Sequence, residues 1–306
     1  MQINDILSFL DQEGTFYTFI GSSNAVVNSF CPLKDLRPES MTWVRSINRD
    51  ICYRLNQIPS ILAFCDVNQS DGLIFQCNAI LVENPHRTFF RVLMRFFYHD
   101  EPHQIAGSAV IESDDIGKSL SCGHFSFIGK DVRIGDDCYI GNNVTIEGKV
   151  TIGDRVRIDS GCRIGVSGFG HYINEDGTIT GIPHLGGVQI GSDTRIGANS
   201  VVAAGTLGPT ILGDFVMVDG LCYIAHNASV GNRVFVTGGS GVAGSAVIED
   251  DVWISPRCVI NSSTTVGRGA FIAMGSIVTK DVPPDQYVCG APAVAHGPVR
   301  HNKYKI

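Results

Sequence analysis

The chain has 306 residues, of which 44% are hydrophobic, and a formal charge of −7. This length and composition suit two soluble domains of roughly 100–200 residues each. The negative charge argues against a nucleic-acid partner, whose phosphates need a basic face. We find no basic leader and no stretch of about 18 apolar residues, so we expect a cytoplasmic protein without membrane insertion. The ten cysteines occur singly, without CxxC pairs, and are expected to be buried thiols.

Residues 1–104 contain no repeat and predict a small α/β domain. Residues 59–67 and 72–85 predict buried strands. Residues 86–100 predict a helix, and the simplest role for its aromatic face is core packing.

An aliphatic residue then returns at every sixth position. The series runs from Val110 to Ile164, from Ile190 to Val202 and from Leu212 to Val278, and only Cys122 among its 25 positions is not Ile, Val or Leu. Glycine directly follows many of these residues, where we expect tight corners at positive φ. Neither a heptad helix nor a β-sandwich gives a strict period of six. The pattern therefore predicts a parallel β-helix whose stacked coils bury one aliphatic column.

The repeats resemble the hexapeptide transferase family. This resemblance implies a mainly β domain, a left-handed β-helix with three hexads per coil, here about eight coils over residues 105–282, followed by a C-terminal tail, residues 283–306. It also implies a homotrimer. Two interruptions of the period, residues 166–187 and the four extra residues between Val202 and Leu212, are expected to form loops that leave the prism, and such loops commonly carry function.

One residue of the repeat region can carry acid–base chemistry. His226 lies two residues beyond Ile224, near a corner of the coil. A regular coil contains about eighteen residues, so the predicted neighbours of His226 in the two adjacent coils are Gly208 and Gly244. His226 is either a surface histidine beside tight turns or a general base with the Gly244 N–H beside it for a developing oxyanion. Asp219 could orient such a base.

Four segments strengthen the second interpretation. The segments RIGVSGFGHY, GIPHLGGVQIG, DGLCYIAHNASVG and GVAGSAVI resemble segments of the UDP-3-O-acylglucosamine N-acyltransferase family of lipid A synthesis in sequence and in order. Residues 1–104 also resemble the uridine-binding domain of that family. The resemblance implies that His226 is the general base, that Asp219 orients this base, and that Gly244 donates its N–H to the oxyanion. A sugar ammonium must lose a proton before it attacks a thioester, and an imidazole with a pKa near about 6.5 suits that task.

No metal site is expected, because the other histidines form no close zinc-ligand pattern with His226. The histidines near enough in the prism to alter this are His124, His171 and His184.

Departures from that family concern its nucleotide. Ser263 stands where the family has a second histidine. The uracil-binding segment here gives Trp43, Ser46 and Arg49, and Trp43 either stacks on a base or packs in the core.

The C-terminal departure concerns the acyl donor. Residues 272–293 resemble the closing segment of hexapeptide acetyltransferases that use acetyl-CoA. Gly275 and Lys280 are therefore candidate donor-binding residues, with Lys280 either on a CoA phosphate or simply solvated.

These observations predict an N-acyltransferase that moves an acetyl or hydroxyacyl group from acyl-CoA to a nucleotide-linked amino sugar of a surface polysaccharide, O-antigen or lipopolysaccharide. Candidate substrate-binding residues are Trp43, Phe169, His171, Tyr172 and Asn227, and no permanently bound cofactor is expected. The alternatives are the lipid A enzyme itself, with acyl carrier protein as donor, a non-catalytic β-helix binding module and a metal-dependent hydratase.

Overall fold

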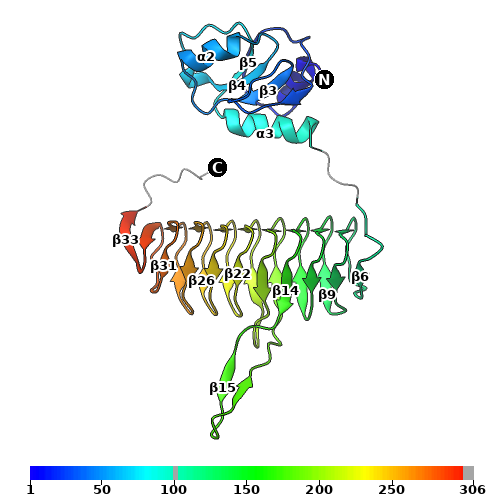
Figure 1. Ribbon diagram of the computed structural model, residues 1–306, viewed down its shortest axis with the longest axis vertical. Coiled ribbons are helices and arrows are strands. Elements are labelled where there is room, and N and C mark those ends of the chain that lie inside the picture. Colours follow the sequence, from blue (N-terminus) through cyan, green and yellow to red (C-terminus); the bar gives the residue numbers. More distant parts are fainter. Residues whose placement is uncertain (99–102, 299–306) are drawn as a thin grey trace. The chain divides into compact units, whose positions relative to one another are not determined.

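The computed structural model describes residues 1–98 and 103–298 (Figure 1). The chain divides into two compact units, Met1–Glu101 and Pro102–Ile306.

The first unit is a mixed five-stranded sheet with three helices. Its strand order is β1-β5-β4-β3-β2, and β1 pairs antiparallel with β5 while the other pairs are parallel. The elements are α1 (Ile3–Gln12), β1 (Thr18–Ile20), β2 (Ser29–Phe30), β3 (Ser40–Trp43), α2 (Arg49–Asn56), β4 (Leu62–Asp66), a 3₁₀ turn (Val67–Gln69), β5 (Asn78–Val82) and α3 (Pro85–Phe96).

The predicted strands and helix of this unit are confirmed by β4, β5 and α3. Asn84 caps α3, because its side-chain oxygen accepts the Arg87 N–H at 2.9 Å. The helix packs its aromatic face inward, as expected, through buried Phe89, whose ring lies 5.7 Å from that of Phe64. Phe90 on the same helix remains 41% exposed. Residues 99 and 100 of the predicted helix lie outside the described residues.

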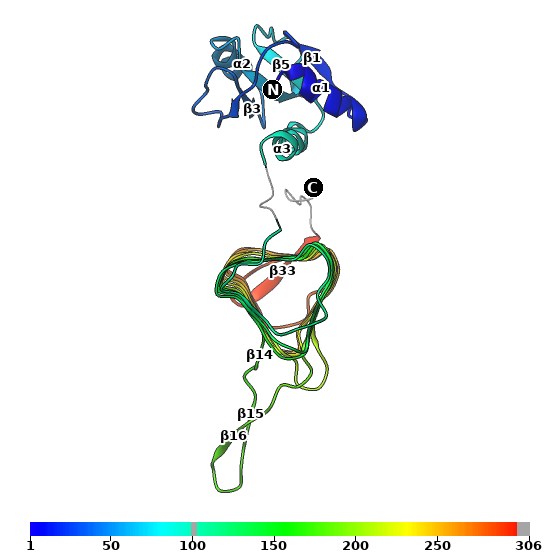
Figure 2. The same ribbon diagram turned by 90° about the vertical axis from the view of Figure 1, so that its right-hand side faces the viewer.

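The second unit is the expected left-handed parallel β-helix, a prism with three faces (Figure 2). The first face contains β7 (Ser121–Cys122), β10 (Tyr139–Ile140), β13 (Arg157–Ile158), β18 (Arg195–Ile196), β21 (Met217–Val218), β24 (Phe235–Val236), β27 (Trp253–Ile254), β30 (Phe271–Ile272), β32 (Gln286–Gly290) and β33 (Ala293–Pro298).

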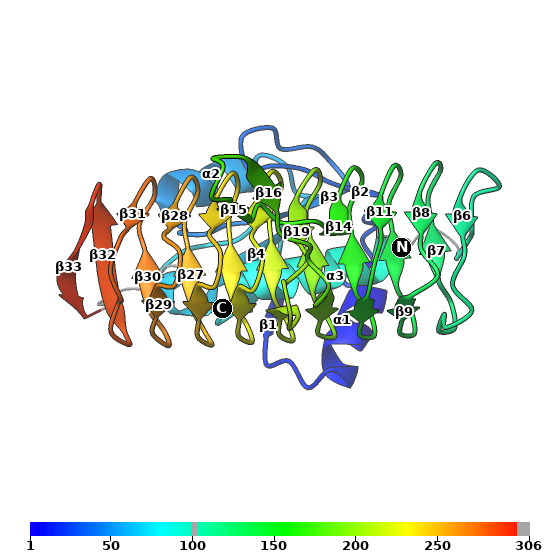
Figure 3. The same cartoon turned by 90° about the horizontal axis from the view of Figure 1, so that it is seen from below.

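The second face contains β6 (Val110–Ile111), β8 (Phe127–Ile128), β11 (Thr145–Ile146), β14 (Arg163–Val166), β19 (Val201–Ala203), β22 (Tyr223–Ile224), β25 (Gly241–Val242), β28 (Val259–Ile260) and β31 (Ile277–Val278). The third face contains β9 (Val132–Ile134), β12 (Val150–Ile152), β17 (Val188–Ile190), β20 (Thr210–Leu212), β23 (Ser229–Val230), β26 (Val247–Ile248) and β29 (Thr265–Val266). The successive strands lie in order along the prism (Figure 3).

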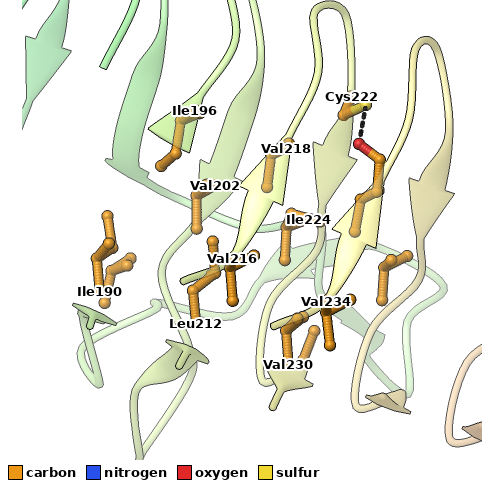
Figure 4. Close-up of a cluster of buried hydrophobic side chains, with 14 of the residues drawn as sticks. Ile190, Ile196, Val202, Leu212, Val216, Val218, Cys222, Ile224, Val230 and Val234 are labelled. Carbon is orange, nitrogen blue, oxygen red and sulfur yellow. Dashed lines mark hydrogen bonds between the residues drawn. The ribbon is translucent and has the colours of Figure 1, made fainter. Parts of the chain in front are cut away.

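In-register pairing of parallel strands explains the period of six. Ile140 pairs with Ile158 on the first face, and Val242 pairs with Ile260 on the second. From Ile116 onward, each period residue therefore stacks on its counterpart one coil away and points into the prism, where the side chains form one buried cluster (Figure 4). The predicted first position, Val110, is wrong, because Val110 is 52% exposed and its neighbour Ile111 is the residue that pairs with Ile128. Burial of this continuous apolar column is the main stabilising contribution, since no single coil can cover its own aliphatic face.

The cysteines are buried as expected. All ten are free, and nine are buried while Cys289 is half-buried. Burial raises the pKa of the Cys138 thiol to about 11, so this thiol stays protonated near neutral pH.

The glycines that follow the period residues have a different role from the one expected. Gly165 has the expected positive φ, 83°, but elsewhere positive φ falls two residues later, for example at Asp137 (57°), Asn143 (54°) and Asn227 (60°). The glycine position is instead one of close approach: a Cβ on Gly141 would lie 2.5 Å from the Ser160 backbone nitrogen of the next coil. Glycine is needed there because the neighbouring coil leaves no room for a side chain.

The end of the prism also differs from expectation. The predicted tail, residues 283–306, contains β32, which pairs parallel with β30, and β33, which pairs antiparallel with β32. The first face has ten strands, of which nine are parallel and β33 is antiparallel. Each coil contributes one parallel strand to this face, so the prism is about one coil taller than the eight or so coils predicted from the period. Residues 299–306 of the predicted tail lie outside the described residues.

We expect Gly141→Ala to destabilise the prism by about 1–3 kcal/mol, because the new methyl group overlaps the next coil. Chemical denaturation followed by circular dichroism measures this. Gly241→Ala is the matched control, because a Cβ at Gly241 meets no heavy atom within 4 Å. Equal denaturation midpoints for the two variants would contradict the close-approach explanation.

Candidate functional site

Both interruptions of the period leave the prism as loops, as expected, and they meet beside the same corner. Residues 166–187 form the hairpin of β15 (His171–Ile173) and β16 (Ile179–Gly181), which projects from the prism (Figure 1). The returning arm of this loop binds the loop between β19 and β20. The Leu185 N–H donates to the Thr206 carbonyl at 2.9 Å, and the Gly186 N–H donates to the Gly205 carbonyl at 2.8 Å.

His226 lies at this corner, between β22 and β23, where the second face turns into the third. Strand pairing stacks one column of residues at this corner: His226, Gly244, Ser262 and Lys280. A Cβ on Gly244 would lie 2.7 Å from Cε1 and 2.9 Å from Nε2 of His226. The predicted proximity of Gly244 to the imidazole is confirmed, and the absence of a side chain at Gly244 makes room for the ring.

The prediction that Gly208 is the neighbour of His226 in the preceding coil is wrong. Val202 pairs with Ile224, so four extra residues lengthen the offset on the second face to 22, and the counterpart of His226 in the preceding coil is Ala204. The extra residues leave the prism in the loop between β19 and β20.

Two backbone amides at this corner, those of His226 and Gly244, are uncapped, whereas the Ala204 N–H donates to the Val166 carbonyl at 2.8 Å. At the corner between the third and first faces, a side chain of the next coil accepts the N–H at the same position in each coil, as at Lys118, Asp136, Asp154, Ser192, Asp214 and Asn232. No acceptor among the described residues receives the N–H of His226 or of Gly244. Gly244 is buried, and a buried unpaired N–H is uncommon in folded proteins. Both donors are therefore available to a ligand oxygen.

Asn227 fixes the tautomer of His226. The Asn227 side-chain oxygen accepts from the Thr206 N–H at 2.8 Å and faces its hydroxyl at 3.0 Å. The amide NH₂ must then be the group that faces His226 Nδ1 at 3.0 Å. Because an NH₂ group only donates, Nδ1 accepts and the neutral ring carries its proton on Nε2. Asn227, expected to bind substrate, thus has both ends of its amide engaged within the chain, and it orients the imidazole.

Asp219 does not have the orienting role within one chain. It follows β21 at the corner between the first and second faces, one corner before His226. Its carboxylate accepts from the Gly220 N–H at 2.7 Å and from the Gly238 N–H at 3.1 Å. The spacing of seven residues crosses a whole strand and therefore separates the two side chains.

A second imidazole lies beside His226. The ring centroid of His184, on the returning arm of the hairpin loop, is 5.1 Å from that of His226. Gly168 lies against both residues, since its Cβ would be 2.7 Å from His184 Nε2 and 2.8 Å from His226 Cβ. Sequence reasoning noted His184 as close in the prism but gave it no role, because the path of a loop cannot be deduced from the repeat.

The surroundings lower the pKa of His226 below its usual value. Partial burial is the larger cause and the nearby charge of His184 the second, while a hydrogen bond to the Phe169 carbonyl acts in the opposite direction. A lowered pKa keeps the imidazole neutral at neutral pH, which is the form that can take up a proton.

Of the remaining candidates, Phe169 contacts this cluster through its backbone carbonyl. The Phe169 side chain is 82% exposed and contacts His171 at 5.4 Å between ring centroids, and Tyr172 is 53% exposed on β15. Gly275 has a positive φ of 71°, which gives it a turn role, and Lys280 is exposed beyond β31.

In the first unit, Trp43 is half-buried with its ring edge-on to His86 at 4.7 Å, so part of this ring packs within the unit. The Ser46 hydroxyl donates to Gln69 at 2.9 Å.

Neither a resident metal site nor a membrane span is found in the described part of the chain. No group of three or more His, Cys, Asp or Glu side chains is placed to hold a metal ion among residues 1–98 and 103–298. No helix within the same ranges is long and apolar enough to cross a membrane.

The fold and the corner site define a parallel β-helix protein built from hexapeptide repeats. The family models for the bacterial transferase hexapeptide match residues 131–165 and 245–280, and the hexapeptide repeat of succinyl-transferase matches residues 187–224. The repeats of this chain are thus similar to those of hexapeptide transferases over the matched residues.

Two curated relatives are UDP-3-O-acylglucosamine N-acyltransferases. The protein of Shewanella denitrificans is 49% identical over 26% of this chain and 24% of its own length, and that of Maricaulis maris is 53% identical over 44% of this chain and 39% of its own length. The chain thus matches well under half of these relatives.

Solved structures extend the similarity to a larger share of the chain. The UDP-N-acetylglucosamine acyltransferase of Campylobacter jejuni has a TM-score of 0.57 at 25% identity, over 64% of this chain and 75% of its own. The corresponding Bacteroides fragilis enzyme has a TM-score of 0.56 at 26% identity, over 64% and 74%.

We expect Asn227→Asp to raise the pKa of His226, because a carboxylate beside Nδ1 favours the protonated ring. Two-dimensional NMR titration of the histidine ring protons measures the shift. Asn199→Asp is the matched control, since Asn199 has the same left-handed conformation (φ 59°) at another corner. An unchanged His226 titration in Asn227→Asp would show that the amide does not face the imidazole.

Proposed function

We propose that this protein is an N-acyltransferase that transfers an acyl group from a thioester to the amino group of a nucleotide-linked amino sugar. The observation that supports it is the corner cluster: a partly buried imidazole with a lowered pKa lies against buried Gly244, whose backbone N–H has no acceptor among the described residues. A base beside an oxyanion donor is the minimum that acyl transfer to an amine requires.

The reaction needs no covalent intermediate on the chain, because a thioester is already activated. The sugar ammonium loses a proton to become an amine, and the amine nitrogen attacks the thioester carbonyl carbon. The carbonyl oxygen becomes an oxyanion that accepts from the Gly244 N–H. The adduct loses its second proton to the His226 imidazole, and its collapse breaks the C–S bond and expels the thiolate, which takes up a proton. For His226 to act, the substrate N–H replaces the Asn227 amide as the donor to Nδ1.

Acyl-CoA is the proposed donor. Lys280 lies in the column of His226, three coils further along the prism, or about 14 Å at the usual strand separation. An extended pantetheine arm laid along this column would place its thioester near Gly244 and its phosphates near Lys280. Gly275, one coil corner earlier, would line the same end of the prism.

The acceptor is proposed to contact the hairpin. Phe169, His171 and Tyr172 lie on the loop that also carries His184, and their exposed rings suit a sugar or a nucleobase. For the first unit taken by itself, half-buried Trp43 is the proposed residue for stacking on a nucleobase. Lipid A synthesis with acyl carrier protein as donor is the second candidate, because the two curated relatives have UDP-3-O-acylglucosamine as the acceptor in their names. Either pathway would place the protein in the cytoplasm.

We also propose that the chain works as a homotrimer with its sites between subunits. This assembly offers Asp219 a role that it lacks within one chain, since a corner of one prism can face the His226 corner of its neighbour. Light scattering on the intact chain tests the assembly, and a monomer at micromolar concentration would contradict it.

His226→Ala should lower turnover by roughly 100- to 10,000-fold through loss of the general base. The assay follows thiol release from acetyl-CoA and from a hydroxyacyl carrier protein, with UDP-glucosamine and UDP-3-O-acylglucosamine as acceptors. His124→Ala is the control, because His124 is an exposed histidine of the same prism. Turnover by His226→Ala equal to that of the parent removes His226 from the mechanism, and no thiol release with any pair leaves a binding module as the better proposal.

Lys280→Ala should raise the KM for acetyl-CoA with little change in kcat, which is the signature of lost uniform binding. The matched control is Lys130→Ala, because Lys130 is an exposed lysine at the same type of corner in an early coil. If only acylated carrier protein supports turnover, and CoA thioesters are inert at millimolar concentration, the CoA assignment is wrong.

A further inference from the structure

His184 carries a buried polar atom that the fold does not use. Its Nε2 has no hydrogen-bond partner, and the only other such buried side-chain atom among residues 1–98 and 103–298 is the hydroxyl oxygen of Thr42. Buried polar atoms are nearly always paired in folded proteins. An unpaired imidazole nitrogen next to a candidate catalytic residue therefore indicates a group held for a ligand.

Ser167 contacts the other nitrogen of this ring. The Ser167 hydroxyl oxygen is 3.2 Å from His184 Nδ1. When this oxygen accepts from Nδ1, the neutral ring carries its hydrogen on Nδ1 and its lone pair on Nε2, the atom without a partner. A base at His184 requires this tautomer.

The loop presents this nitrogen to the same place as His226. Gly168 has no side chain and so leaves room for the two rings to meet, and a Cβ on Gly170 would lie 3.3 Å from His184 Cε1. The other groups around the pair are the Ser167 hydroxyl, the Phe169 carbonyl and the Asn227 amide. None of these titrates near neutral pH, so the two imidazoles are the titratable pair of the site.

We propose that His184 is a second catalytic base. It takes the first proton from the ammonium of the acceptor before the attack, and His226 takes the second proton from the adduct. This inference rests on the proposed function. Acylation of an ammonium removes two protons from one nitrogen, whereas acylation of a hydroxyl removes one. A site with two imidazoles about 5 Å apart provides one acceptor for each step.

The proton balance is as follows. His184 Nε2 takes a proton from R–NH₃⁺ and leaves R–NH₂, whose lone pair forms the new C–N bond. His226 takes the second proton from the cationic nitrogen of the adduct, and the C–S electron pair leaves with sulfur. One imidazolium returns its proton to the thiolate and the other releases its proton to water. The sum is ammonium plus thioester to amide, thiol and one proton.

The same contacts allow a purely structural role, in which His184 holds the hairpin loop against the corner. The two roles differ in their pH dependence. A base for the ammonium is needed only while the acceptor is protonated, and a free amine has a pKa near about 8. Loss of a structural contact would reduce activity equally at every pH.

The experiment compares His184→Gln with the parent from pH 6 to pH 9.5, using acetyl-CoA or hydroxyacyl carrier protein with UDP-glucosamine and UDP-3-O-acylglucosamine. We expect kcat/KM to fall about 100-fold at pH 6.5, and the deficit to shrink to a few-fold above pH 9, where the amine is unprotonated. His124→Gln is the matched control and should follow the parent. Circular dichroism and light scattering verify that the variant is folded.

A second measurement needs no substrate. In the NMR titration of the free protein, His184→Gln should raise the pKa of His226, because a neighbouring positive charge is removed. An unchanged His226 titration, activity equal to the parent at all pH values, or a loss that does not vary with pH overturns the role of His184. The proposed function then still stands if His226→Ala is inactive. If no acceptor is acylated by the parent protein, the proposed function fails and this inference fails with it.

Discussion

The in-register stacking of parallel strands is the constraint from which the rest of this structure follows. Each coil stacks on the next at the usual distance between hydrogen-bonded strands. Inward-pointing side chains therefore pack on the side chains at the same position of the adjacent coils, and the repeat stays strict. Residues in excess of a coil have no place in the stack and must leave at a corner. The hairpin at 166–187 and the loop between Val202 and Leu212 are the two places where they do so. Because they leave on consecutive coils at neighbouring positions, their backbones bind each other, and together they enclose the corner of His226.

The repeat was enough to predict the prism, since its period is a direct image of the stacking. The aliphatic positions and the loops at the interruptions follow from it without knowledge of any contact. The corners were placed correctly, but the reason given for their glycines was wrong. Gly141 looks from sequence like a turn glycine, yet the space above it is what excludes a side chain. A one-dimensional pattern records which positions stay small and not which neighbour requires it.

The candidate site was predictable only as far as the stack controls it. Gly244 was placed beside His226 because one regular coil separates them, and Gly208 was misplaced because the intervening coil is irregular. Asp219 was misplaced for a different reason: seven residues along a prism cross one face, so sequence proximity there means different corners. Asn227, adjacent in sequence, is the residue that reaches the ring. His184 lies 42 positions before His226 and arrives through a loop, whose path depends on hydrogen bonds that no period encodes.

The corner also shows why the site can hold two imidazoles. A prism surface is flat and solvated, and histidines on it would titrate independently and near their usual pKa. The hairpin loop changes this by covering part of the corner, which lowers the pKa of His226 mainly through burial and then through the charge of His184. Both effects require that the loop carry glycine at Gly168, because a side chain there would separate the rings. The scaffold thus supplies a fixed column with uncapped amides, and the loop supplies the low-dielectric cover and the second ring. Variation of the loop can change the acid–base properties of the corner while the aliphatic column stays the same.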